Sequence, residues 1–482
     1  MKLLVIGLDG VDRRLVEHFD MPFTRSLLEQ LVVLPVKEDL WSRGWVKMLS
    51  GLPPTTTGAY YEQPALNGKP AFTQSYGSKS YPTNAARKPL WAEVDALGKR
   101  AAWLNLPTMM PAPALNGVVL GGAGGGFSPE NRIPPAACHP PELQDLFIRE
   151  RMVWENRYIV SGIRHTDLFF AKCTEALWSR ARIYADLVQN SGRMDLGFFV
   201  QKEPVVISNI YMYSIEQLME VKQARLAVHY LLNQFYSALD DTLKYVFDRL
   251  QPEQVMVVSD HGAAPYRKSM NFNVMLQDLG FLRYKAEKGT APARGGAVQK
   301  LKARFAHEVR QVTNGHPRPD FPPFTPIDFG HTKAFTNFYV PGIFLYDQRF
   351  GGPALSAEQA QALTDAIVRD FNAHPVAKEN KLVARPFRRE HAGTPAYDLL
   401  PEVWVDHPVD LFPEQRGQAV QKNPYYRDWS DLAGLPRDIG SGKKSPDALC
   451  VVDPRFLRDV DPTRAGLDLT VVHELVLNHF RS

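Results

Sequence analysis

The sequence has few cysteines and no run of apolar residues long enough to cross a membrane. Cys138, Cys173 and Cys450 are an odd, widely separated set without the short spacing of a metal or redox motif. We therefore expect free thiols in a reducing compartment, with the cytoplasm as the location. The first residues resemble a core strand and lack the cleavage pattern of a signal peptide, so we expect no membrane association.

The chain also lacks a strong excess of charge of either sign. Its 56 basic and 52 acidic residues give a formal net charge of +4, which is small for 482 residues. This balance gives no reason to expect a nucleic-acid partner. The apolar and charged fractions, 44% and 22%, are typical of a globular protein, and the length allows one large core with insertions or several domains.

Two apolar segments, far apart in the sequence, each end in acidic residues. Residues 255–258, Val-Met-Val-Val, predict a buried parallel strand that runs into Ser-Asp-His-Gly at 259–262, where we expect the glycine to allow a turn. Residues 2–6 predict a second strand, followed by Gly-Leu-Asp-Gly at 7–10. In open α/β sheets, ligands bind beyond the carboxyl ends of the strands. Both motifs are therefore expected at the functional edge of one sheet.

Asp9, Asp260 and His261 are the candidate metal ligands in these motifs. Carboxylates and an imidazole that converge on one point can bind a divalent cation. The alternative is structural: Asp9 and Asp260 cap helices and His261 is merely exposed. Two acidic strand ends, one of them with an adjacent histidine, fit a metal site better together than either does alone.

The remainder of the chain alternates between strand and helix patterns. We expect helices at 11–30, 90–97, 143–192, 216–250 and 357–371, and strands at 31–36, 101–106, 194–200, 334–346, 402–405 and 448–452. The predicted core comprises residues 1–127 and 193–482. Residues 128–192 are predicted to form a helical cap insertion over the site, and 285–326 a basic, proline-rich insertion within the core. The glycine run at 121–126 lacks the Lys and Ser/Thr of a P-loop and predicts a flexible link.

This order of motifs resembles the alkaline phosphatase superfamily, and within it the type I phosphodiesterase/nucleotide pyrophosphatase branch. Besides the two acidic motifs, four segments resemble those of the branch: Leu90-Trp91 through Asn105-Leu106-Pro107, Pro140-Pro141-Glu142-Leu143, residues 328–335 (D-F-G-H-T-K-A-F) and residues 396–399 (A-Y-D-L). The resemblance implies an α/β fold with a doubly wound, mostly parallel sheet, helices on both faces and a helical cap.

The resemblance also implies a site for two metals, of which this chain keeps one ligand set. Asp9, Asp260 and His261 match the ligands of one metal. At the positions expected for the other metal, the chain has Val205, Asn209 and, near the C-terminus, Lys444. Glu203 could substitute for the ligand lost at Val205. We therefore expect at most one divalent metal ion, with zinc, manganese and calcium not distinguished, or none.

The position that holds the family's Thr or Ser nucleophile is Trp41 here. Ser42, the next residue, is the candidate nucleophile, and the alternative is an ordinary loop serine or helix cap. Trp41 could stack on a substrate ring or belong to the core.

Several cationic residues could bind an anionic group beside this nucleophile loop. Lys444 is placed to stabilise charge on a transferred group, and Asn209 is a further candidate for substrate binding. Arg43, Lys47 and Lys443 could join Lys444 in an anion-binding cluster. The alternative for Lys443 and Lys444 is a solvated pair in a loop.

These features predict an enzyme that cleaves or transfers a phosphate- or sulfate-type ester of a small anionic molecule, using at most one divalent metal. A transferase that forms no covalent intermediate is a variant of this hypothesis. The alternative is a catalytically inactive pseudoenzyme that keeps the fold as a binding or scaffold protein. The sequence does not indicate an oligomeric state.

Overall fold

The computed structural model describes residues 1–82, 87–122, 132–154, 165–221, 226–285, 326–429, 440–464 and 466–481. Most of the predicted basic insertion at 285–326 and of the glycine run at 121–126 lies outside the described residues. Among the helices described, none is long and apolar enough to cross a membrane.

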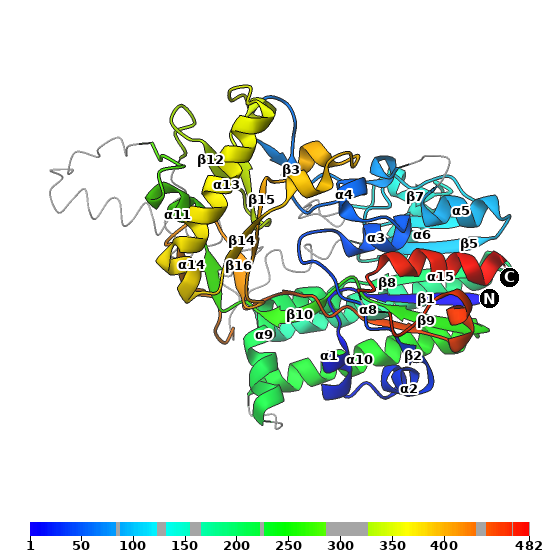
Figure 1. Cartoon of the computed structure of the whole chain (residues 1–482). Coiled ribbons are helices and arrows are strands. Elements are labelled where there is room, and N and C mark those ends of the chain that lie inside the picture. The colour runs from blue at the N-terminus through cyan, green and yellow to red at the C-terminus, as the bar shows by residue number, and fades with distance from the viewer. Residues whose placement is uncertain are drawn as a thin grey trace, which may run out of the picture.

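An eight-stranded sheet, in the order β2-β19-β9-β1-β8-β5-β6-β7, forms the centre of the molecule (Figure 1). Its five inner strands are parallel and almost wholly buried, which explains their uninterrupted apolar sequences. They are β1 (Leu3–Leu8), β5 (Ala101–Leu106), β6 (Gly117–Gly121), β8 (Leu196–Gln201) and β9 (Gln254–Val258). The outer strands β2 (Val32–Val33), β7 (Cys138–His139) and β19 (Cys450–Val452) pair antiparallel.

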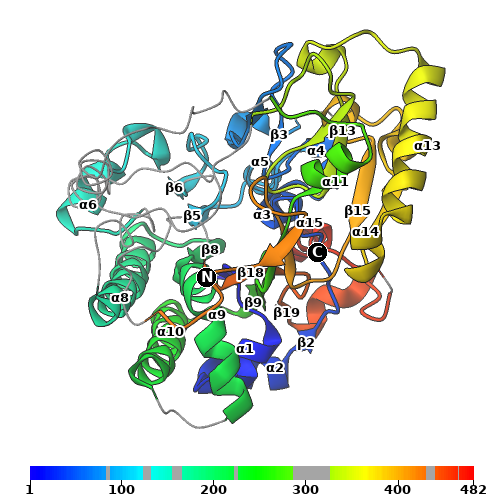
Figure 2. The same ribbon diagram turned by 90° about the vertical axis from the view of Figure 1, so that its left-hand side faces the viewer.

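Helices cover both faces of this sheet, as predicted. One apolar core includes residues of α1 (Arg13–His18), α2 (Pro22–Gln30), α6 (Leu143–Arg149), α8 (Thr166–Asn190), α9 (Glu203–Val221) and α10 (Ala227–Leu250). The core on the opposite face includes residues of α3 (Gly44–Ser50), α5 (Leu90–Ala96) and α15 (Thr470–Arg481). Figure 2 shows α6, α8 and α10 on one side of the strands and α3, α5 and α15 on the other.

Within residues 143–192 the described helices are α6 and α8, and their position differs from that of a cap over the strand ends. α8 packs along α10 and against β8, and its buried residues belong to the core on that face of the sheet (Figure 2). The apolar residues of α8 therefore pack in the core on one face of the sheet, and they do not cover the strand ends. The predicted helix at 11–30 is likewise two helices, because Pro22 begins a new helix after the break at residues 19–21.

A second lobe, assigned from the sequence to the single core, has an apolar core of its own. Its four-stranded antiparallel sheet comprises β12 (Ala334–Thr336), β13 (Gly342–Leu345), β14 (Val383–Pro386) and β15 (Val403–Asp406). A three-stranded sheet comprises β11 (Lys268–Met270), β16 (Leu411–Pro413) and β17 (Val420–Lys422). The helices that accompany them are α11 (Phe272–Asp278), α13 (Ala357–Ala373) and α14 (Pro375–Glu379).

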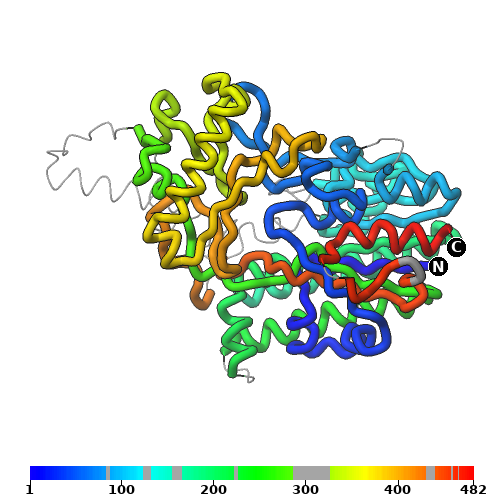
Figure 3. The backbone as a smooth tube through the Cα atoms, in the orientation of Figure 1, coloured from blue at the N-terminus to red at the C-terminus, as the bar shows by residue number. Residues whose placement is uncertain are grey.

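The lobe lies beyond the carboxyl ends of the parallel strands, at the opposite end of the molecule from both termini (Figure 3). Short elements connect it to the central sheet. β10 (Gly262–Pro265) pairs antiparallel with β18 (Gly442–Ser445), and β3 (Gln63–Pro64) pairs with β4 (Phe72–Thr73). α4 (Pro54–Thr57) contacts the lobe directly, because the carbonyl of Thr55 accepts a hydrogen bond from the Ala396 amide at 3.2 Å.

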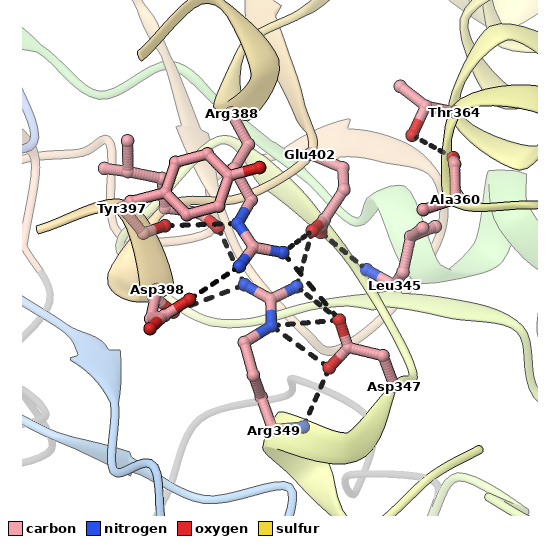
Figure 4. A network of polar contacts seen from close by, with 10 residues as sticks. Leu345, Asp347, Arg349, Ala360, Thr364, Arg388, Tyr397, Asp398 and Glu402 are labelled. Carbon is pink, nitrogen blue, oxygen red and sulfur yellow. Dashed lines mark hydrogen bonds and ion pairs between the residues drawn. The ribbon is translucent and has the colours of Figure 1, made fainter. Parts of the chain in front are cut away.

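A network of arginines and carboxylates stabilises the second lobe (Figure 4). Glu402 is its centre: Oε1 accepts hydrogen bonds from Arg349 at 2.5 Å and Arg388 at 2.8 Å, and Oε2 accepts one from the Leu345 amide at 2.9 Å. The side chains of Arg349 and Glu402 are each 7% exposed, and Asp347 shares the Arg349 guanidinium. Each buried charge therefore depends on the others.

We expect Glu402→Ala to destabilise this lobe by about 3 kcal/mol, because it leaves buried arginine charge poorly compensated and an amide unpaired. Hydrogen exchange of the native protein measures the effect locally. Amides of β13 and β15 should lose protection, whereas those of β1 and β9 should keep theirs.

The matched control for this variant is Asp365→Ala, which removes an ion pair with Arg389 in which both side chains are 48% exposed. It should change protection by no more than about 0.5 kcal/mol. Unchanged exchange in Glu402→Ala, or equal losses in the lobe and the central sheet, would contradict this description of the lobe.

Candidate functional site

Asp9 and Asp260 are brought together by the pairing of their strands. β1 and β9 are parallel neighbours, with Gly7 opposite Val258, so their carboxyl ends lie side by side. Asp9 follows β1 directly, and its amide donates to the Gln201 carbonyl at 3.0 Å. Asp260 follows β9 after one serine. The helix cap in this region is Asp12, which caps α1, so neither Asp9 nor Asp260 has the structural role considered as the alternative.

His261 completes a compact cluster with these two carboxylates. Its Nε2 lies 3.5 Å from Asp9 Oδ1 and 3.5 Å from Asp260 Oδ2. One candidate ligand atom from each of the three residues lies within 4.8 Å of the others, and this is the only such group of three in the described parts of the chain. The structure thus brings together the three residues that the sequence singled out.

The protonation state of His261 suits metal binding. Its Nδ1 lies 2.7 Å from the carbonyl oxygen of Gly262 and donates to it, which leaves the Nε2 lone pair facing the carboxylates. Nε2 is buried without a hydrogen-bond partner. Burial, together with the Lys444 charge, lowers the pKa of His261 to about 3, so the imidazole is neutral. A neutral imidazole fixed by a carbonyl at the other nitrogen is the usual arrangement of a metal-bound histidine.

The two carboxylates are costly to ionise together. Burial, reinforced by the neighbouring Asp260, raises the pKa of Asp9 to about 7. Burial also raises the pKa of Asp260, against the opposing attraction of Lys444. Two nearby buried carboxylates favour binding of a cation, because the cation removes their mutual repulsion.

The ammonium group of Lys444 is one such cation. Lys444 lies in strand β18, whereas the sequence was expected to form a loop there. Ala263 of β10 pairs with Lys444 of β18, which places the lysine beside the Asp260-His261 turn. Lys444 Nζ lies 3.7 Å from Asp260 Oδ2 and 3.9 Å from the centre of the Tyr61 ring, and it donates to the Tyr61 hydroxyl. Burial lowers the pKa of Lys444, while Asp260 and Asp9 oppose this change.

Glycines allow the close packing around this turn. Gly262 lies in β10 and not in the turn that was expected from the sequence. A glycine is needed there because of the close packing around it. A β-carbon at Gly262 would lie 2.5 Å from both the Asp447 carbonyl and the Ser445 hydroxyl. A β-carbon at Gly44, the first residue of α3, would lie 2.4 Å from the Asp260 carbonyl. The start of α3, just after Trp41 and Ser42, is therefore in direct contact with the Asp260-His261 turn.

Lys443 does not accompany Lys444, because successive side chains of a strand point to opposite faces. Its Nζ donates to the Leu411 carbonyl and lies 5.7 Å from the ring centres of both Trp41 and Phe412. Burial lowers the pKa of Lys443 to about 7. Lys443 therefore packs near Trp41. It does not join Lys444 in the anion-binding cluster that was expected from the sequence.

Lys47 is also not free to bind an anion. Its buried ammonium donates to Glu38 Oε2 and to Asp39 Oδ2, both at 2.7 Å. Arg43, in contrast, remains close to the cluster: its guanidinium lies 5.1 Å from the Tyr61 ring centre and donates to the Gln74 carbonyl at 2.6 Å.

Ser42 and Trp41 come just before Gly44, which approaches Asp260, and their side chains face different surroundings. The Ser42 hydroxyl is buried and donates to Asp39 Oδ2 at 2.7 Å. Trp41 packs in an apolar group with Tyr60, Phe387 and Trp404, at the contact between the two lobes. Trp41 thus faces the second lobe, whereas Ser42 is held by a carboxylate of its own loop.

Two of the three positions that the resemblance assigns to a second metal, Val205 and Asn209, lie on α9. A β-carbon at Gly10, the residue after Asp9, would lie 3.0 Å from Val205 Cβ, so an apolar side chain stands where a ligand was expected. Asn209, one turn later, is exposed. Glu203 pairs with Arg180, and both side chains are fully buried, so one oxygen of this suggested substitute is already bound within the protein.

Sequence reasoning missed Tyr61 and Asp39. Tyr61 contacts Lys444 from a loop that carries no recognisable motif. Asp39 precedes the candidate nucleophile by three residues, and an acidic residue at this spacing from a serine is a common local hydrogen-bond pattern that could have indicated it.

Comparison with known proteins agrees with this fold. The family model described as type I phosphodiesterase/nucleotide pyrophosphatase matches residues 3–368. No curated protein matches the sequence. Phosphonoacetate hydrolase from Sinorhizobium meliloti, solved with phosphonoacetate, is 11% identical, with a TM-score of 0.53 over 100% of this chain and 96% of its own. Murine ectonucleotide pyrophosphatase/phosphodiesterase 5, inactive and in complex with AMP, is 12% identical, with a TM-score of 0.48 over 100% and 95%.

At 11% identity, the likeness to the hydrolase shows a shared alkaline-phosphatase-like fold. The family match is more specific, because it spans most of the sequence, including Asp9, Asp260 and His261. The chain belongs to the type I phosphodiesterase/nucleotide pyrophosphatase family.

Proposed function

We propose that this chain cleaves or transfers a phosphate- or sulfate-type ester, using at most one divalent metal and a lysine in place of the second. The proposal rests mainly on one observation: Lys444 Nζ lies 3.7 Å from Asp260 Oδ2, beside the Asp9, Asp260 and His261 cluster. A fixed ammonium can stabilise negative charge on a transferred group, as a second metal would.

The three clustered residues fit a single divalent ion. Two carboxylates and one neutral imidazole form a donor set that transition metals accept, and the lone pair of His261 Nε2 has no other partner. When bound, such an ion would neutralise charge on the ester and activate an attacking oxygen. Lys444 sets the limit of one ion, because its ammonium would repel a second cation in the same space.

Lys444, Tyr61 and Arg43 are the groups we propose for binding the anionic part of the substrate. Burial raises the pKa of Tyr61 well above its usual value, so its hydroxyl stays protonated and can donate. Arg43 lies over the same ring. The related phosphonoacetate hydrolase was solved with a small anion, phosphonoacetate, and we propose a small anionic ester as the substrate here.

Ser42 is the proposed nucleophile if the reaction passes through a covalent intermediate. Its hydroxyl donates to Asp39 at 2.7 Å. Burial acts to raise the pKa of Asp39, but the Lys47 charge together with hydrogen bonds from Lys47, Ser42 and the Trp41 amide lowers the pKa overall. Asp39 is therefore a weak base, and Ser42 needs a second source of activation.

A pseudoenzyme remains the second candidate, favoured by the same lysine. The Lys444 ammonium already compensates part of the charge at Asp260, and Trp41 stands at the family's nucleophile position. The cysteines Cys138, Cys173 and Cys450 are buried and free. We propose a reducing compartment such as the cytoplasm for either function.

Metal binding tests the first part of the proposal. Isothermal titration with Mn²⁺ or Zn²⁺ should give one site in the wild type and none in His261→Ala. Lys444→Met should bind the ion about tenfold more tightly, because the repelling ammonium is gone.

Lys443→Met is the matched control for Lys444→Met, since the two side chains point to opposite faces of one strand. It should leave metal affinity unchanged. The metal site would be ruled out if the wild type bound no ion, or if His261→Ala bound the ion as tightly as the wild type does.

Turnover tests the second part, with a panel of aryl phosphate monoesters, diesters and sulfates. We expect Lys444→Met to lower kcat/KM by about a hundredfold or more, because a preorganised charge at the transferred group is removed. Lys443→Met should retain activity. Retained activity in Ser42→Ala would exclude a covalent intermediate on this residue, and phosphate binding without any turnover would favour the pseudoenzyme.

A further inference from the structure

Glu62 directly follows Tyr61, at the base of the hairpin formed by β3 and β4. Gln63 pairs with Thr73 in this hairpin, so Glu62 and Gln74 flank the paired residues. Gln74 Nε2 donates a hydrogen bond to Glu62 Oε1 at 2.8 Å. A side-chain hydrogen bond therefore closes the hairpin at the end next to Tyr61.

Gln74 also holds Arg43. Its carbonyl accepts a hydrogen bond from the Arg43 guanidinium at 2.6 Å, while its side chain bonds to Glu62. The same guanidinium lies 5.1 Å from the Tyr61 ring centre, and the Tyr61 hydroxyl accepts from Lys444. Glu62 is thus adjacent to Tyr61 in the chain and connected to Arg43 through one intervening residue.

The other carboxylate oxygen of Glu62 binds the second lobe. Oε2 accepts a hydrogen bond from Asn337 Nδ2, and Asn337 directly follows β12. The Asn337 side chain is itself held, because its Oδ1 accepts from Gln415 Nε2 at 3.2 Å. Gln415 Nε2 also donates to the Thr336 carbonyl at 2.9 Å. A fixed amide of the second lobe therefore binds the loop that carries Tyr61.

Apolar packing already attaches the hairpin to this lobe. The ring centre of Phe72, in β4, lies 5.2 Å from that of Phe344 and 5.8 Å from that of Phe350. Phe72 packs against the apolar core of the second lobe. The polar contact at Glu62 therefore adds alignment at Tyr61 to an attachment that the aromatic rings provide.

The carboxyl group of Glu62 has only neutral amides as hydrogen-bond partners among the described residues. Burial raises the pKa of Glu62 to about 7, and the Gln74 hydrogen bond opposes this rise. A partly buried carboxyl without a cationic partner is costly, and its negative charge repels an anion bound nearby. Its useful contribution is geometric, because two acceptor oxygens hold amides from two different segments.

We propose that Glu62 is a positioning residue that holds Tyr61 and Arg43 in the anion site and connects both to the second lobe. The proposal rests on the proposed function, because it takes these two side chains as part of the site that binds the anionic group of the ester. Glu62 acts through them and is not a catalytic residue.

Isothermal titration of the full chain with inorganic phosphate tests the proposal. Glu62→Met keeps the length of the side chain but removes both acceptor oxygens. It should weaken phosphate binding about tenfold, because Tyr61 and Arg43 are no longer preorganised.

Glu62→Gln is the matched control. Its amide oxygen can accept from Asn337, and its nitrogen can donate to the Gln74 side-chain oxygen once that amide rotates. It should bind phosphate at least as tightly as the wild type. Both variants lose the same negative charge, so a purely electrostatic role predicts tighter binding in both. Equal affinities of Glu62→Met and Glu62→Gln would overturn the proposal.

Asn337→Ala tests the connection to the second lobe. It removes the donor to Glu62 Oε2 and leaves the hydrogen bond from Gln74 in place. Phosphate binding should weaken about threefold, as expected for the loss of one hydrogen bond. An unchanged affinity would overturn the role of the second lobe.

Hydrogen exchange separates failure of this proposal from failure of the proposed function. If the wild type binds no phosphate, the anion site is wrong, but the amides of Tyr61 and Arg43 still report on the loop. They donate to the carbonyls of Trp41 at 3.0 Å and Ala59 at 2.8 Å. They should lose protection in Glu62→Met and keep it in Glu62→Gln. Unchanged protection in both variants, or a loss in Glu62→Met that extends to β1 and β9, would contradict a local positioning role.

Discussion

The buried pair of carboxylates at the ends of β1 and β9 imposes the main physical constraint on this molecule. Parallel pairing of the two strands forces Asp9 and Asp260 together, and their burial makes ionisation of both costly without a cation. Two sources of positive charge are within reach: Lys444 from β18, and a metal ion at the free lone pair of His261. The balance between them determines whether the site holds one ion or none.

The rest of the local fold maintains this arrangement. β10 and β18 pair so that Lys444 lies opposite Ala263, and the absence of side chains at Gly44 and Gly262 lets α3 and residues 445–447 approach the same turn. On the other side of the nucleophile loop, Lys443 supports Trp41, which in turn packs against the second lobe. One pair of adjacent lysines thus contacts the charged cluster on one face and the aromatic side chains of Trp41 and Phe412 on the other.

The fold was largely predictable from the sequence. Of the site, only Asp9, Asp260 and His261, which follow the ends of β1 and β9, could be predicted to lie together. The apolar runs of β1, β5, β8 and β9 identify buried parallel strands, and the alkaline-phosphatase-like fold is confirmed. The roles of Lys47 and Lys443 depend on the face of the helix or strand from which each side chain projects. The sequence predicted loops around these residues, and a loop does not define such a face. The separate second lobe and the packing of α8 on the sheet depend on long-range contacts that periodicity does not encode.

The most direct test of the single-cation site is a crystal structure of the full chain grown with Mn²⁺, with anomalous scattering used to locate the ion. We predict one anomalous peak, bound by Asp9, Asp260 and His261 Nε2, with the Lys444 ammonium near Asp260 and no second peak beside Val205. Two metal ions in the site, or the three ligand side chains pointing away from one another, would contradict the account.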